Sequence, residues 1–284
     1  MGGDCIANPI PCPSRVSPDQ SPEMSPSNSG SLIAFGRVCF GAGVAGLGVQ
    51  HLVIAGFVPV VLPSLPISVP GHGILPFVVG LALIIAGTAI AMGKRARAAA
   101  IFLGVAFLAS LVLRHIPLQV ASGTLWPIAV WNNPLKLLTL AGGAFAVAAS
   151  VEGLEEHRMN TFCTAFGCFA LALTCALFGF EHFQYVQFVA GLVPAWIPAH
   201  VFWTYFCGGA LMAAGIGMLL RIQARLAAGL LGLMIFIWFI VLHIPRALAD
   251  PRSGGGNEWA SVFESLAFAG IGFILSQTLP AKAR

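Results

Sequence analysis

Residues 80–87 read Gly-Leu-Ala-Leu-Ile-Ile-Ala-Gly, and residues 208–215, 128 positions later, read Gly-Gly-Ala-Leu-Met-Ala-Ala-Gly. Both stretches are apolar and begin and end with glycine, a pattern that lets membrane helices pack closely. The same offset relates Arg97-Ala-Ala-Ala to Arg225-Leu-Ala-Ala. These matches predict a tandem duplication of one helical unit, in which the glycines serve as helix contacts.

Six of the seven histidines repeat with nearly the same spacing. The pairs are His51 with His182, His72 with His200, and His115 with His243. The first pair is 131 positions apart and the other two are 128 apart. We therefore expect one loop of the first copy, between its first and second helices, to be three residues longer than its counterpart.

The composition is that of an integral membrane protein. Hydrophobic residues make up 58% of the 284 residues, charged residues 8%, and the mean hydropathy is +0.90. Such a chain has the lipid bilayer as its main partner. The net charge of +4 is accounted for by basic loops, so we expect no nucleic-acid partner.

The apolar runs predict an all-α polytopic membrane protein with eight transmembrane helices. The expected helices cover residues 32–56, 73–92, 98–116, 134–151, 161–182, 201–220, 226–244 and 259–279. They divide into two tandem parallel four-helix-bundle repeats, 31–152 and 160–280. Residues 1–30 are rich in proline and serine and predict a disordered N-terminal tail.

Basic residues lie mainly at one end of this arrangement. On that side are Lys94, Arg95, Arg97, Arg158, Arg221, Arg225, Lys282 and Arg284, against Arg114, Arg246 and Arg252 on the other. Lys and Arg stay preferentially in the cytoplasm. The pattern predicts cytoplasmic N- and C-termini in the plasma (inner) membrane, and it places the histidines near the outer face.

The second copy is the richer in carboxylates, because Glu181 and Glu264 stand where the first copy has Gln50 and Lys136. Ionisable groups inside a membrane are costly and are functional candidates. We expect Glu181, Glu264 and Lys136 as catalytic groups, although Lys136 and Glu264 also fit a structural ion pair.

Imidazole nitrogens bind transition metals and haem, or exchange hydrogen bonds and protons with a quinone. The candidates for cofactor binding are His51, His115, His182 and His243. A mixed nitrogen and oxygen metal shell would comprise His182, His200, His243, Glu181 and Glu264. Residues 246–258, with three consecutive glycines, suit a flexible connector or a lid over the second copy.

Gly179-Phe-Glu-His-Phe, Val193-Pro-Ala-Trp-Ile-Pro and His243-Ile-Pro resemble the DoxX-like membrane family. Members of that family are four-helix proteins, so the chain looks like two such units fused. The resemblance implies a redox subunit that passes electrons to membrane quinone.

Two functions follow as hypotheses. The first is a redox protein or oxidoreductase subunit with a His/Glu site at the outer face, linked to a metal, haem or quinone and to a partner redox subunit. The second is a transporter or assembly partner with a polar path between the two bundles. The sequence contains no P-loop or serine-hydrolase motif and no C-x-x-C pair.

Overall fold

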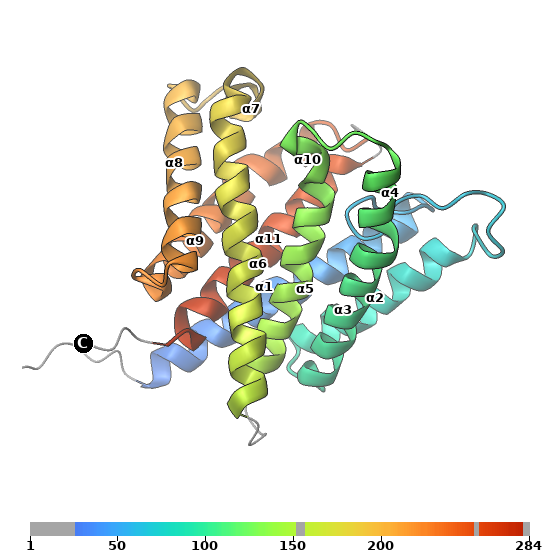
Figure 1. The fold of residues 1–284 in the computed structure, drawn as a ribbon, viewed down its shortest axis with the longest axis horizontal. Coiled ribbons are helices and arrows are strands. Elements are labelled where there is room, and N and C mark those ends of the chain that lie inside the picture. The colour runs from blue at the N-terminus through green and yellow to red at the C-terminus, as the bar shows by residue number, and fades with distance from the viewer. Residues whose placement is uncertain (1–25, 152–156, 253–255, 281–284) are drawn as a thin grey trace, which may run out of the picture.

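The computed structural model describes residues 26–151, 157–252 and 256–280, and within these ranges it contains helices and no strand (Figure 1). Residues 1–25 of the predicted tail lie outside the described residues. The tail prediction extended too far, because the first helix already begins at Pro26.

Each of the eight predicted ranges is helical, with boundaries that differ by a few residues. The α-helices are α1 Pro26–Val53, α2 Leu75–Ala91, α3 Ala96–Ser110, α4 Ile116–Ala121, α5 Asn132–Ser150, α6 His157–Gln184, α7 Val186–Leu192, α8 His200–Leu219, α9 Ala224–Trp238, α10 Ile244–Ala249 and α11 Asn257–Thr278. The short helices α4, α7 and α10 extend or follow longer ones at the end of the molecule where the repeated histidines lie.

The described residues contain six helical segments long and apolar enough to cross a bilayer. They are Gly30–Val53, Ala96–Ala121, Arg158–Gln184, His200–Leu219, Ala224–Ala249 and Asn257–Thr278. The chain is therefore a membrane protein. The sequence predicted eight spanning helices. The two that are not among these six are α2, which has 17 residues, and α5, which begins with the polar residues Asn132 and Asn133.

Two of these segments contain a π-helical turn just before a proline. Residues Leu111–His115 form this turn between α3 and α4, and Phe239–His243 form it between α9 and α10. Pro117 and Pro245 have no backbone N–H and their rings crowd the preceding turn, which favours a local widening of the helix. Each turn ends on one of the repeated histidines.

Small residues set the distance between the long helices. Helix α1 packs along α2 and α11, and α6 packs along α8 and α5; Figure 1 shows α1 and α11 running side by side. A Cβ atom on Gly270 would lie 2.4 Å from the carbonyl oxygen of Gly36, and one on Gly167 would lie 2.7 Å from that of Gly142. Close backbone approach of this kind needs glycine.

The glycines that begin and end the two quoted stretches make the expected helix contacts, whereas a Cβ atom at Gly209 would meet nothing within 4 Å. A Cβ atom added at Gly80, Gly87 or Gly215 would lie between 2.5 and 2.8 Å from a backbone oxygen of the neighbouring helix. At Gly208 it would lie 2.7 Å from the Cβ of His182. The role predicted for these glycines is confirmed.

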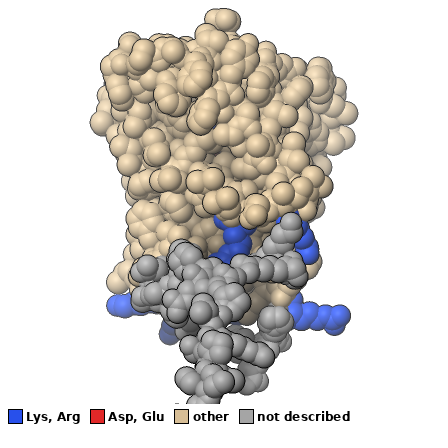
Figure 2. Space-filling model, turned by 90° about the vertical axis from the view of Figure 1, so that its left-hand side faces the viewer, with Lys and Arg blue, Asp and Glu red and all other residues tan. Residues whose placement is uncertain are grey.

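Two arginines connect helices at one end of the molecule. Arg97 Nη1 donates to the Ala148 carbonyl at 3.1 Å, and Arg225 Nε donates to the Ser276 carbonyl at 2.9 Å. Figure 2 shows Lys and Arg side chains gathered at one end of the face in view. We call this end of the molecule the basic end.

The close contact between α1 and α11 gives a test of this packing. Gly270→Ala places a methyl group against the backbone of Gly36 and should lower the free energy of unfolding by about 1–3 kcal/mol. Thermal unfolding in detergent measures the loss. Gly209→Ala is the matched control, because a Cβ atom there meets nothing within 4 Å. Equal unfolding temperatures for the two variants would contradict this packing.

Candidate functional site

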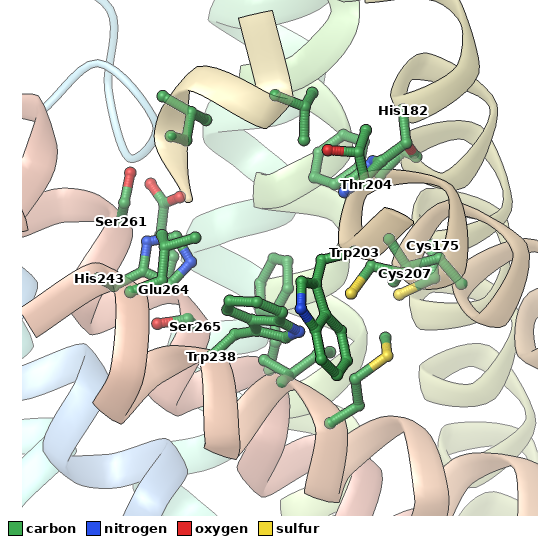
Figure 3. A pocket seen from close by; sticks show the side chains of 18 of the residues that line it. Cys175, His182, Trp203, Thr204, Cys207, Trp238, His243, Ser261, Glu264 and Ser265 are labelled. Carbon is green, nitrogen blue, oxygen red and sulfur yellow. The ribbon is translucent and has the colours of Figure 1, made fainter. Parts of the chain in front are cut away.

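A cavity of about 270 Å³ lies among α6, α8, α9 and α11 (Figure 3). Its walls are mostly aliphatic and aromatic side chains, with α7 contributing Val189 and Leu192. The charged and imidazole groups that line it are Lys136, His182, His243 and Glu264. The cavity therefore combines an apolar surface with a few polar groups, the usual composition of a small-molecule site.

Lys136 and Glu264 form an ion pair in this cavity. Lys136 Nζ lies 2.8 Å from Glu264 Oε2, and the exposed fractions of the two side chains are 21% and 6%. Lys136 comes from α5 and Glu264 from α11, two helices that contact each other. A charge buried alone in a membrane protein is costly, so each side chain depends on the other. The ion pair considered in the sequence analysis is present.

His182 presents one ring nitrogen to the cavity. Its Nδ1 lies 2.7 Å from the carbonyl oxygen of Phe178, one turn earlier on α6. A carbonyl only accepts, so Nδ1 donates, and Nε2 of the neutral ring is an acceptor. Within the described part of the chain Nε2 has no hydrogen-bond partner, so it is free to bind a ligand.

His243 lies at the end of the π-helical turn and also lines the cavity. Figure 3 shows His243 and Glu264 on one side of the cavity and His182 on the other. Between them lie Trp203 and Trp238, whose rings meet edge to face with centroids 6.1 Å apart. The two imidazoles thus face a space bounded by aromatic rings.

The corresponding histidines of the first half are arranged differently. His51 donates from Nδ1 to the Leu47 carbonyl at 2.8 Å, and its Nε2 accepts from the Val58 N–H at 3.3 Å. The ring is fully buried. His51 therefore has no ring nitrogen free for a cofactor, which differs from the predicted role.

The loop after α1 fills the space that is open in the second half. Val58, Val60 and Val61 are buried, and His115 lies against the backbone of Val60 and Val61. This loop contains the three extra residues counted in the sequence. The first-half histidines, His51 and His115, thus pack against a loop, whereas His182 and His243 line a cavity.

The predicted metal shell is not assembled. Glu181 and His200 are not among the residues that line the cavity. Glu181 is next to His182 on α6, but its Oε2 accepts from Asn132 Nδ2 at 3.2 Å, and neither of these two residues lines the cavity. Within residues 26–151, 157–252 and 256–280, no group of three or more His, Cys, Asp or Glu side chains is placed to hold a metal ion.

The proposed lid is partly outside the described residues, which omit 253–255. Its two ends are joined by an ion pair, in which Arg246 donates from Nε and Nη2 to the two carboxylate oxygens of Glu258 at 3.1 and 2.5 Å. The two-point contact links α10 to the start of α11.

Sequence reasoning missed the aromatic part of the site. Trp203 and Trp238 lie on apolar helices, where hydropathy does not distinguish a cavity wall from a lipid-facing surface. Their spacing of 35 positions carries no motif. A signal was present only in their type, because tryptophan in a helix interior often bounds a binding surface.

The chain matches no protein family, no curated protein and no solved structure.

The buried ion pair predicts a non-additive pair of mutations. Lys136→Met leaves Glu264 charged and unpaired, and should lower the free energy of unfolding by about 3–5 kcal/mol. Adding Glu264→Gln to Lys136→Met removes the unpaired charge and should restore part of the stability. Thermal unfolding of both single variants and the double variant measures this coupling. Additive losses would contradict a direct interaction.

Proposed function

We propose that the protein is a DoxX-like redox protein, or an oxidoreductase subunit, of the plasma (inner) membrane that binds a quinone-type ligand in the cavity described above. The observation that carries the proposal is the free Nε2 of His182 in an aromatic cavity that also contains His243 and the Lys136–Glu264 pair.

The chemistry of a quinone ring fits these groups. The ring is flat and apolar and carries two oxygens, which accept hydrogen bonds as carbonyls and donate them as quinol hydroxyls. Lys136 has three N–H donors and uses one toward Glu264, so it has donors left for a carbonyl. Neutral His182 accepts a hydrogen bond from a quinol hydroxyl. The cavity can therefore both bind the quinone ring and exchange protons with it.

The size of the cavity supports a ring rather than a larger group. About 270 Å³ is just below the usual range for small-molecule sites, which begins at roughly 300 Å³. A ring-sized headgroup fits that volume, and an isoprenoid tail would extend into the bilayer. A porphyrin is larger, so the cavity favours a quinone over haem.

We also propose that the chain consists of two tandem four-helix repeats with eight membrane crossings and both termini on the cytoplasmic side. The support is a set of equivalent contacts at offsets of 131 for the first helix and 128 for the others. Gly36 with Gly270 corresponds to Gly167 with Gly142. In the same way, the Arg97 bond to Ala148 corresponds to the Arg225 bond to Ser276. The basic end is then cytoplasmic.

The alternative of a transporter or scaffold has less support. A second cavity, at the basic end, shares no lining residue with the first. The second cavity therefore does not extend the polar groups of the first cavity into a path toward the other face of the membrane. Two separate cavities favour a binding site at one end over a conduit.

Equilibrium binding of a short-chain quinone and quinol to protein in nanodiscs tests the proposal. Quenching of tryptophan fluorescence reports occupancy, because Trp203 and Trp238 line the cavity. His182→Phe should weaken quinol binding about five- to tenfold, because the phenyl ring has no acceptor atom. His200→Phe is the control, because His200 is outside the cavity, and should bind as the wild type does.

Equal binding by the wild type and the His182→Phe variant would refute the assignment of the cavity. Elemental analysis and an optical spectrum of the same samples test whether the cavity instead holds a metal or haem. A stoichiometric metal or a haem band that is lost in His182→Phe would assign the cavity to that group in place of a quinone.

A further inference from the structure

The second cavity lies at the basic end and is larger, about 1070 Å³. The start of α6, the end of α8, the start of α9 and the end of α11 surround it. It is separate from the quinone site, so nothing below depends on the proposed function. Figure 2 shows basic side chains at this end of the molecule.

Two guanidinium groups give this cavity a positive charge. Arg221 and Arg225 line it, and its described lining residues include no Asp or Glu. Arg225 uses Nε to bind the Ser276 carbonyl, which fixes the side chain and leaves both Nη groups as donors. Arg221 lies close enough to Cys168, on the cavity wall, to act on it electrostatically.

Two kinds of neutral donor in the same wall, the Thr164 hydroxyl and the first N–H groups of α9, have no side-chain partner among the described residues. Thr164 is 8% exposed and lines the cavity, and its hydroxyl forms no hydrogen bond with the described residues. Helix α9 starts beside it at Ala224, and the side chain of the preceding Gln223 makes no capping hydrogen bond. The first N–H groups of α9 are therefore also available to an anion.

The corresponding place in the first half is occupied by the protein itself. There Arg37 from α1 reaches Gly93, where an added Cβ atom would lie 3.2 Å from Nη2 of Arg37. At offsets of 131 and 128, Arg37 corresponds to Cys168 and Gly93 to Arg221. In the first half the guanidinium belongs to Arg37 on α1, whereas in the second half it belongs to Arg221 in the loop between α8 and α9. Arg221 takes the left-handed backbone conformation, φ 57°, that Gly93 takes at φ 71°.

Apolar residues adjoin the charged part of the cavity. Phe169 and Leu219 line it and are 48% and 41% exposed, so they are accessible to lipid chains. An anion site with two arginines, unpaired neutral donors and an apolar border suits a phosphate attached to a lipid.

We propose that the cavity at the basic end binds a phosphate group, carried by an anionic phospholipid of the adjacent leaflet. The phosphate interacts with Arg221, Arg225 and the Thr164 hydroxyl, while the acyl chains lie along Phe169 and Leu219.

Thermal unfolding of full-length protein in detergent, titrated with phosphatidylglycerol, phosphatidylcholine or inorganic phosphate, tests the proposal. Native mass spectrometry of the same samples counts bound lipid. Phosphatidylglycerol should bind several-fold more tightly than phosphatidylcholine. Arg221→Gln and Thr164→Val should each reduce that affinity, the arginine variant by about fivefold. Lys94→Gln is the control, since it removes one charge at the basic end outside this cavity.

Two results would overturn the lipid proposal. One is equal binding of phosphatidylglycerol and phosphatidylcholine. The other is an Arg221→Gln variant that binds phosphatidylglycerol no worse than Lys94→Gln does. Stabilisation by inorganic phosphate alone, lost in Arg221→Gln, would support the phosphate site and assign it to a soluble phosphate compound in place of a lipid.

Discussion

The ion pair between Lys136 and Glu264 constrains both the packing and the chemistry of this protein. Its 2.8 Å contact lies where α5 of the first half meets α11 of the second. A membrane interior makes either charge alone expensive, so the two helices cannot separate without exposing an unpaired ion. The same two groups line the cavity that we assign to a quinone-type ligand. One interaction thus joins the halves and supplies charge to the site.

The two halves use similar elements to different effect. In each, an imidazole near the end of the first helix donates to the carbonyl four residues earlier, as His51 does to Leu47 and His182 to Phe178. In the first half the second ring nitrogen accepts from Val58, and the loop buries the ring. In the second half α7 borders an open cavity. Among the described residues, the histidine end of the molecule therefore has one open cavity with repeated histidines in its wall, formed by the second half with Lys136 contributed by the first.

Much of the helical framework could be predicted from the sequence. Apolar runs mark the helices because the hydrocarbon core tolerates few polar groups. The alignment of Lys136 with Glu264 anticipated their contact, since equivalent helices of a duplicated protein often meet. The glycines at 80 and 208 likewise indicated close packing, and the structure places both against a neighbouring helix.

The side-chain directions could be predicted only in part. Glu181 and His182 are adjacent on one helix, and adjacency does not reveal that only His182 lines the cavity, since Glu264 and Ser265 line it together. The extra residues after His51 were visible as a length difference, but length does not reveal that Val58 bonds to the ring. The π-helical turns also have no hydropathy signal, although each ends at the histidine of a His-Ile-Pro sequence.

The claim that only the second half has an open site can be tested by carbethoxylation of the histidines with diethyl pyrocarbonate, mapped by mass spectrometry. The reagent attacks an unprotonated ring nitrogen that it can reach. We expect modification of His182 and His243, protection of His51 and His115, and protection of His182 when a short-chain quinone is bound. Modification of His51 as fast as His182, with no effect of quinone on either, would contradict it.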